Sequence, residues 1–145
     1  MDDIVTGALS GRSRGPAGGS STAARALRWL LLLALCSAYL QGGIMKALAF
    51  DAVLPEFERL GLHPAYPLLV ATILLEVGAS VLILLGYRRR GAAIALAVFT
   101  IAATLVANRF WSIAMPDRVP AMNAFFEHLG LAAAFILLAW TERTP

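Results

Sequence analysis

The chain has 145 residues, of which 59% are hydrophobic and 14% are charged, whereas soluble domains carry about 25% charged residues. Its mean hydropathy is +0.74. This composition leaves too little polar surface to cover a soluble core and predicts a membrane protein. The net charge of +3 does not indicate nucleic-acid binding, because the basic residues lie at span ends and in one short link rather than in a stripe among aromatics.

The cysteine and histidine content excludes two classes of redox protein. Cys36 is the only cysteine and falls inside the first hydrophobic run, so the chain has no intrachain disulfide and no C-x-x-C pair. A quinone-linked disulfide oxidase that works through its own cysteines is therefore excluded. The two histidines, His63 and His128, are too few and too far apart to predict a haem or copper site, and no metal site is expected.

The chain divides into a polar tail and a single membrane domain. Residues 1–24 are rich in Gly, Ser and Ala without apolar periodicity, which predicts a disordered cytoplasmic tail. Residues 25–142 form the expected four-span membrane domain, whose first span covers residues 29–45. This run is too long for a signal-peptide core and no good A-x-A cleavage site follows it, so we expect it to be retained as a span.

Three more apolar runs follow, at residues 66–85, 91–107 and 122–140. At ~1.5 Å per residue, runs of this size cover most of a hydrocarbon layer of ~30 Å. Between the first two runs, residues 54–61 predict a short amphipathic helix that starts at Pro55 and stops at Gly61. The expected fold is all-α: a four-helix transmembrane bundle with a short outer amphipathic helix between spans 1 and 2.

The distribution of basic residues predicts the orientation of the spans. With both termini in the cytoplasm, eight of the twelve Lys and Arg residues lie inside and four lie outside. Three of the eight are packed into the link at residues 86–90. Both termini are therefore expected to be cytoplasmic.

Ionisable groups within the spans gather between the midplane and the outer surface. Leaving such a group unpaired in hydrocarbon costs about 2.5–3.5 kcal/mol on insertion scales, which makes each one a functional candidate. Glu76 lies near the midplane, ~15 Å below the start of its span. An ion path would need polar groups in the inner half as well, so the one-sided distribution favours a pocket open to the outside. The candidate pocket residues are Lys46, Glu76, Arg109, Glu127 and His128.

Each candidate also has a purely structural interpretation. Glu76 is either a protonated packing carboxyl or a group that carries a proton or pairs with a ligand. Lys46 is either an interfacial anchor or an inward-turned partner of Glu76 or Glu127. Contact with Glu76 requires the first helix to continue past Lys46. Arg109 suits a boundary anchor, while His128 suits a hydrogen-bonded helix residue or a proton-linked role.

Several motifs, in their order and spacing, resemble the DoxX family. They are Gly43-x-x-Lys46, Leu60-Gly61-Leu62-His63-Pro64, Leu75-Glu76-Val77-Gly78, Leu84-Leu85-Gly86-Tyr87-Arg88 and Phe126-Glu127-His128-Leu129-Gly130-Leu131. The resemblance implies a small multi-pass protein of the bacterial inner membrane with a loose association to redox biology, since family members are named for a quinol-oxidase subunit. Lys46, Glu76 and Glu127 match the family pattern, whereas many relatives carry Asn at the position of His128.

Three functional interpretations stay open. The first is a redox-associated subunit of the inner membrane, linked to a quinone or to a soluble or membrane oxidoreductase partner. In this interpretation Glu76 takes or gives a proton, and a quinone is the one cofactor considered. The second is an assembly factor that anchors a partner protein, and the third is a small proton-coupled transporter that works as a homo-oligomer. The sequence specifies neither a reaction nor an oligomeric state.

Overall fold

The computed structural model describes residues 19–142, and within that range the regular structure is entirely helical. Four of the helices are long and apolar enough to cross a membrane. This confirms the predicted all-α bundle with four spans. The elements, in chain order, are α1 (Gly19–Leu48), α2 (Phe50–Arg59), α3 (Ala65–Leu85), α4 (Arg89–Ala107), the short 3-10 helix η1 (Phe110–Ser112) and α5 (Arg118–Thr141).

The predicted tail at residues 1–24 falls largely outside the described part of the chain. Residues 1–18 are not described, and α1 begins at Gly19, within the predicted tail. The 30 residues of α1 therefore extend well beyond the apolar run at 29–45 at its amino-terminal side. At the other side α1 continues past Lys46 to Leu48, as a contact between Lys46 and Glu76 requires.

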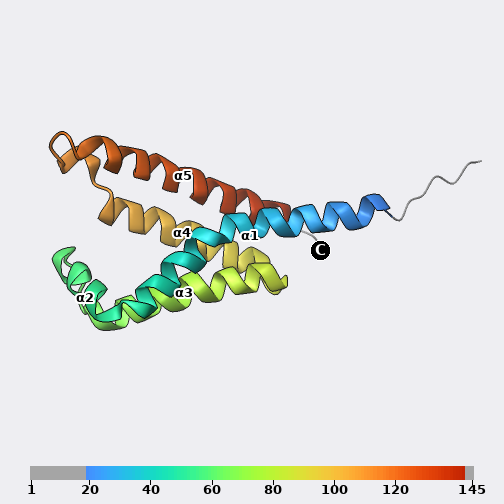
Figure 1. The fold of residues 1–145 in the computed structure, drawn as a ribbon, viewed down its shortest axis with the longest axis horizontal. Helices are drawn as coiled ribbons and strands as arrows, with labels where there is room; N and C mark the ends of the chain where they lie inside the picture. The colour runs from blue at the N-terminus through green and yellow to red at the C-terminus, as the bar shows by residue number, and fades with distance from the viewer. Residues whose placement is uncertain (1–18, 143–145) are drawn as a thin grey trace, which may run out of the picture.

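The spans pack as two antiparallel pairs, α1 with α3 and α4 with α5, which are joined by contacts between α3 and α4. Figure 1 shows the pairs together near the end of α5, beyond which the first turns of α1 project, and spread apart toward α2 and the start of α5. We call the first region the link end, after the link at residues 86–88, and the opposite region the α2 end.

The hydrophobic core occupies the link end of the bundle. Its largest fully buried side chains are Phe135, Ile83 and Leu96, one from each of three spans, and α1 adds Leu32 and Cys36. Small side chains let the helices approach here. They are Ala79 of α3, Ala92, Ala93 and Ala97 of α4, and Ala132 and Ala139 of α5. Close packing of this kind stabilises helix pairs in lipid, where little hydrophobic driving force exists between apolar surfaces.

A glycine sets the distance between α1 and α3 at the α2 end. A Cβ atom added at Gly43 would lie 2.7 Å from Cγ2 of Val77 and 3.3 Å from Cβ of Glu76. Both distances are shorter than ordinary carbon contacts of ~3.5–4.0 Å. The absence of a side chain at Gly43 therefore lets α3 approach the α1 backbone closely.

The short helix between the first two spans is present, but its predicted start is wrong. α2 begins at Phe50, with only Ala49 between it and the end of α1, and Pro55 lies inside α2 rather than at its first position. The helix starts earlier because the backbone amides of Ala52 and Val53 both donate to the carbonyl of Ala49 and close the first turn. The segment before Pro55 contains no helix breaker, so the chain turns directly from α1 into α2.

The predicted stop of α2 is confirmed. Gly61 has a φ of 75°, a left-handed conformation that glycine adopts without steric cost. The amide of Leu62 donates to the carbonyl of Phe57 across this turn at 3.0 Å. The rings of Phe50 and Tyr66 then meet edge to face at 5.3 Å, so α2 is held against the first turn of α3.

Substitution of Gly43 tests the close approach of α1 and α3. We expect Gly43→Ala to lower the free energy of unfolding by about 1–3 kcal/mol, the usual effect of overpacking a tight contact. Val77→Ala in the same chain should restore most of this loss, because it removes the methyl group that the new Cβ would meet. Reversible unfolding in mixed micelles measures the effect.

The matched control for this prediction is Gly78→Ala in α3. A Cβ at Gly78 would meet nothing within 4 Å, so this variant should be as stable as the parent or gain up to about 1 kcal/mol from helix propensity. Equal stability of the Gly43→Ala and Gly78→Ala variants would contradict the packing described above.

Candidate functional site

Lys46 and Glu76 form an ion pair between α1 and α3. The Lys46 ammonium donates to both carboxylate oxygens of Glu76, each at 2.9 Å. The Glu76 side chain is 7% exposed and that of Lys46 is 27% exposed. A Cβ at Gly42 would lie 3.3 Å from Nζ of Lys46 and 3.7 Å from Oε2 of Glu76, so the glycine leaves room for the pair. The pairing with Glu76, left open by the sequence, is therefore present.

The two residues meet because α1 and α3 are offset along the bundle. Glu76 lies eleven residues from the start of α3, which is ~16 Å of helix, whereas Gly43 beside it lies only five residues, or ~8 Å, from the end of α1. α3 therefore extends about one and a half turns beyond α1 at the α2 end, and α2 packs beside α3 there. A residue near the end of one span thus reaches the middle of another.

The ion pair lines a cavity of about 520 Å³ that lies between the two helix pairs and beside α2. This volume is within the range of small-molecule sites, ~300–1,000 Å³. Most of the wall is apolar. The lining residues are Ala38, Tyr39, Gly42, Lys46, Phe57, Leu60, Leu62, Leu68, Thr72, Glu76, Phe99, Thr100, Ala102, Ala103, Val106, Ala107, His128 and Leu131.

Tyr39 places a second polar group on the cavity wall. Thr100 donates its hydroxyl proton to the carbonyl of Leu96 at 2.6 Å, so the hydrogen bond of 2.5 Å between Tyr39 and Thr100 is donated by the Tyr39 phenol. The Tyr39 ring also packs edge to face on Phe135 at 5.2 Å. Sequence analysis missed Tyr39. The available signal was a tyrosine far inside a span, where a buried phenol needs a partner.

His128 is fixed by its own helix and contributes to the cavity wall. Its Nδ1 lies 2.6 Å from the carbonyl of Ala124, so Nδ1 carries the proton and donates it. Asn108 approaches the same ring at 3.4 Å and donates to Thr104 at 3.1 Å. Within residues 19–142, Nε2 of His128 has no protein partner. In the neutral ring this atom is a hydrogen-bond acceptor.

The structure places two candidate residues outside the cavity wall. Arg109 is exposed and its guanidinium donates to the carbonyl of Val106 at 3.2 Å. Glu127 is exposed as well and is not among the residues that line the cavity. Adjacent helix positions point ~100° apart, so the turn of α5 that directs His128 inward directs Glu127 outward. Lys46, Glu76 and His128 are brought together, and Arg109 and Glu127 are not.

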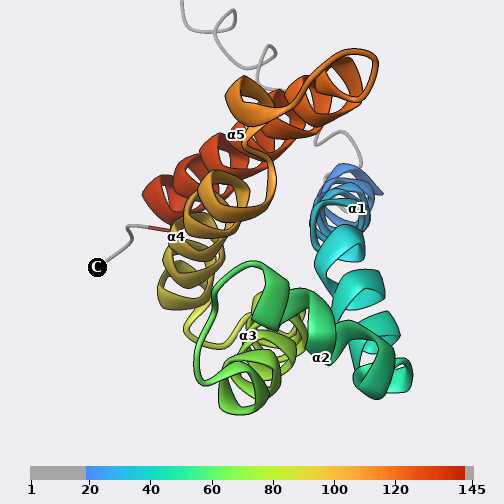
Figure 2. The ribbon, with the colours of Figure 1, turned by 90° about the vertical axis from the view of Figure 1, so that its left-hand side faces the viewer.

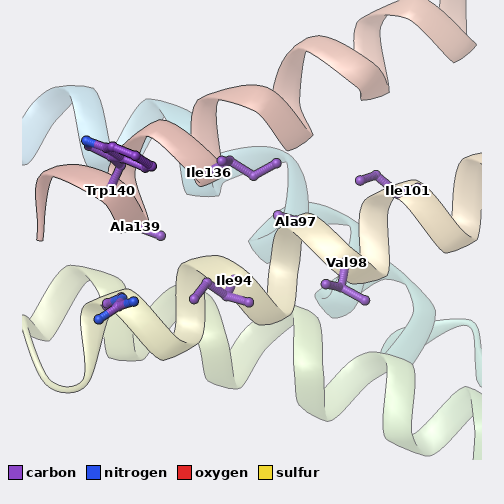
Figure 3. A pocket seen from close by; sticks show the side chains of 8 residues that line it. Ile94, Ala97, Val98, Ile101, Ile136, Ala139 and Trp140 are labelled. Carbon is purple, nitrogen blue, oxygen red and sulfur yellow. The ribbon is translucent and has the colours of Figure 1, made fainter. Parts of the chain in front are cut away.

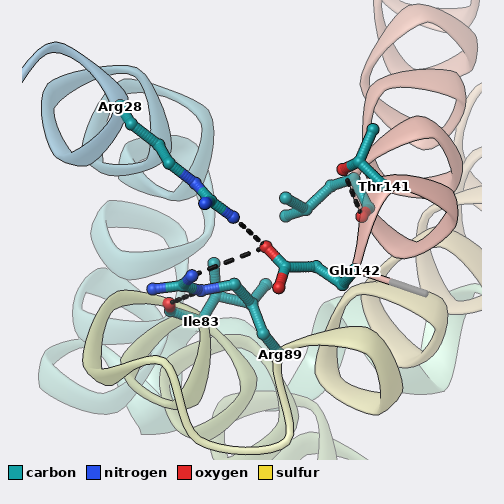
Figure 4. A network of polar contacts seen from close by, with 6 residues as sticks. Arg28, Ile83, Arg89, Thr141 and Glu142 are labelled. Atoms are coloured by element: carbon teal, nitrogen blue, oxygen red, sulfur yellow. Dashed lines mark hydrogen bonds and ion pairs between the residues drawn. The ribbon is translucent and has the colours of Figure 1, made fainter. Parts of the chain in front are cut away.

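A second charged cluster, which sequence analysis missed, closes the link end (Figure 4). The carboxylate of Glu142 accepts hydrogen bonds from Arg28 of α1 and, at 3.5 Å, from Arg89 of α4. Arg89 also donates to the carbonyl of Ile83 at 2.7 Å. The signal was present in the sequence, because Arg28, Arg89 and Glu142 flank three spans on the side that holds both termini.

The cavity groups suit the binding of a molecule with a polar head and an apolar body. An ammonium group has three protons; Glu76 accepts two of those on Lys46, which leaves one for a ligand. The Tyr39 oxygen and Nε2 of His128 offer acceptors. Small-molecule sites usually have a mainly apolar wall with a few polar groups, and this cavity has that composition.

The comparisons with known proteins agree with this architecture. The sequence profile described as DoxX matches residues 28–109, which include α2, α3 and α4, most of α1, and both members of the ion pair. The chain is 27% identical over 99 residues to the inner membrane protein YphA of Escherichia coli (strain K12), covering 68% of this chain and 71% of YphA. No solved structure matches the chain. Because the profile covers more than half of the chain and the structure has four helices able to span a bilayer, the chain belongs to the DoxX family of integral membrane proteins.

Proposed function

We propose that the cavity binds a small amphipathic molecule from the bilayer, a quinone by chemical class, and that the protein is a redox-associated subunit of the inner membrane. The observation that carries this proposal is the Lys46–Glu76 pair on the wall of an otherwise apolar cavity. An oxidoreductase partner would supply or accept the electrons. The redox association that the resemblance to the DoxX family implies is in line with this role, and so is the description of YphA as an inner membrane protein.

The polar groups match both redox forms of a quinone. The carbonyl oxygens of the oxidised form accept hydrogen bonds, and the third proton of Lys46 is available to donate one. The hydroxyls of the reduced form donate hydrogen bonds, which Nε2 of His128 or the phenol oxygen of Tyr39 accepts. The apolar tail would then lie against the wall formed by Phe57, Leu60, Leu62, Phe99 and Val106.

The shape of the bundle favours entry from the lipid. α1 and α5 meet through Tyr39 and Phe135 near the core, but toward the α2 end they lie apart, as Figure 2 shows from that side. Leu60 and Leu68, which line the cavity, are 39% and 38% exposed. A ligand dissolved in the membrane reaches an opening between α1 and α5 directly, whereas a water-soluble ligand would first have to enter the lipid.

Proton-coupled transport receives less support from the described residues. A transport route has to continue from Glu76 to the link end. There the described buried side chains are mostly apolar and include Leu32, Ile83, Leu96 and Phe135. The assembly-factor interpretation differs from ligand binding in a measurable way, because it requires a bound partner and no small molecule.

Quinone retention tests the proposal. Protein purified in a mild detergent and analysed by native mass spectrometry should carry a quinone, or bind added decylubiquinone about once per chain. We expect Glu76→Gln and Lys46→Met to reduce this binding at least tenfold, since the first removes the charge and one of the two acceptor oxygens and the second removes the donor of both hydrogen bonds.

Glu127→Gln is the matched control, because it removes one carboxylate charge from an exposed position outside the cavity wall. It should bind the quinone as the parent does. Absence of binding by the parent, or equal loss in Glu76→Gln and Glu127→Gln, would overturn the proposal. A co-purifying oxidoreductase without a bound small molecule would favour the assembly-factor role instead.

We also propose that the α2 end faces away from the cytoplasm. Lys46 is turned inward, so the described basic residues left at the α2 end are Arg59, Arg109 and Arg118, against Arg25, Arg28 and Arg88 to Arg90 at the link end. This asymmetry follows the positive-inside rule.

Labelling with a membrane-impermeant maleimide tests this orientation. Glu58→Cys on α2 should react in spheroplasts, and Tyr87→Cys in the link should react only after lysis. The native Cys36 is buried and should contribute little background. The reverse pattern would contradict the proposed orientation.

A further inference from the structure

A second hollow lies on the outer face of the α4–α5 pair, away from the central cavity (Figure 3). Its volume is about 160 Å³. Ile94, Val98 and Ile101 form one wall along α4, and Ile136 forms part of the other along α5. The spacing of the α4 residues places them on one face of the helix. The hollow is therefore a groove that runs along the helix pair.

Two alanines explain why a groove exists at this position. Ala97 of α4 and Ala139 of α5 are 2% and 5% exposed and line the groove between the larger side chains. Ile94, Val98 and Ile136 are exposed on either side and reach outward. Small residues between large ones leave a channel rather than a flat surface.

The end of the groove near the link carries a positive charge. Arg90 lines it there, with Trp140 on the opposite helix. Within the described residues, Arg90 has no hydrogen-bonding or ion-pair partner. The nearby acid, Glu142, is already shared by Arg28 and Arg89, as Figure 4 shows. The link end therefore has arginine charge that no described carboxylate neutralises.

The length of the groove matches one leaflet of a bilayer. From Arg90 to Ile101 the helix rises ~16 Å, about half of a hydrocarbon layer of ~30 Å. A phospholipid of one leaflet has an acyl chain of about this reach and a phosphate at the depth of Arg90.

We propose that this groove is a binding site for an anionic phospholipid, whose phosphate pairs with Arg90 and whose acyl chain lies over Ala97 and Ala139. The site is independent of the central cavity and of the quinone proposal. It would attach a lipid to the same two helices that form the far wall of the central cavity.

Lipid titration followed by native mass spectrometry tests the site. The delipidated full-length protein is titrated with phosphatidylglycerol and, separately, with phosphatidylcholine of the same acyl chains. We expect the first phosphatidylglycerol to bind several-fold more tightly than phosphatidylcholine. Arg90→Gln should weaken it about fivefold, the effect of one basic residue beside anionic headgroups.

Arg118→Gln is the matched control, since it removes one arginine from the α2 end and should leave the titration unchanged. A phosphatidylglycerol with a photoactivatable acyl chain locates the site, and we expect its cross-links within residues 94–101 and 136–140. Equal binding of the two lipids, equal effects of the two variants, or cross-links spread over all four spans would overturn the proposal. A dimer that Arg90→Gln dissociates would also overturn it, because a second copy of the chain would then occupy the groove.

Discussion

The ion pair between Lys46 and Glu76 is the interaction on which the α2 end of this protein depends. A carboxylate in the middle of a span is costly in lipid unless a cation and hydrogen bonds compensate it. Here one ammonium group supplies two hydrogen bonds of 2.9 Å. For the ammonium to reach that depth, α1 has to end early beside α3, and Gly42 and Gly43 have to leave room between the helices. α2 then covers the part of α3 that α1 does not reach.

This arrangement divides the bundle into two parts with different roles. The link end contains the packed core and the Glu142 cluster, which connects α1, α4 and α5. The α2 end has fewer buried side chains and contains the central cavity. Most of the packing that holds the spans together is thus at the link end. At the α2 end the two helix pairs lie apart, but the contacts at the link end keep them joined. A binding cavity with apolar walls follows from this geometry together with the single polar pair.

Hydropathy was sufficient to predict the fold class, because four apolar runs of bilayer length leave few other arrangements. The composition also located the central residues, since Glu76 stands alone in its span. One sequence could not show which face of a polar helix segment is turned toward the centre of the bundle. Glu127 and His128 are adjacent and both polar, and only the packing of α5 shows which of them faces the cavity.

The remaining errors have similar physical causes. Pro55 suggested a helix start, but hydrogen bonds to the carbonyl of Ala49 begin α2 before it. Tyr39 was overlooked because its polar atom is a small part of a large ring, and its role depends on Thr100 of another span. Contacts between distant segments decide all of these features, whereas sequence patterns report mainly on neighbouring residues.

A double-mutant cycle on Lys46→Met and Glu76→Gln, read from reversible unfolding in mixed micelles, tests the role of the ion pair most directly. Each single variant should lose about 3–5 kcal/mol of unfolding free energy, and the double variant should lose less than the sum of the two, because no charge is then left buried alone. The exposed pair of Glu56 and Arg59, 3.9 Å apart, is the matched control and should show a coupling below about 1 kcal/mol. Additive losses at Lys46 and Glu76, with a coupling no larger than that of the control pair, would contradict the account.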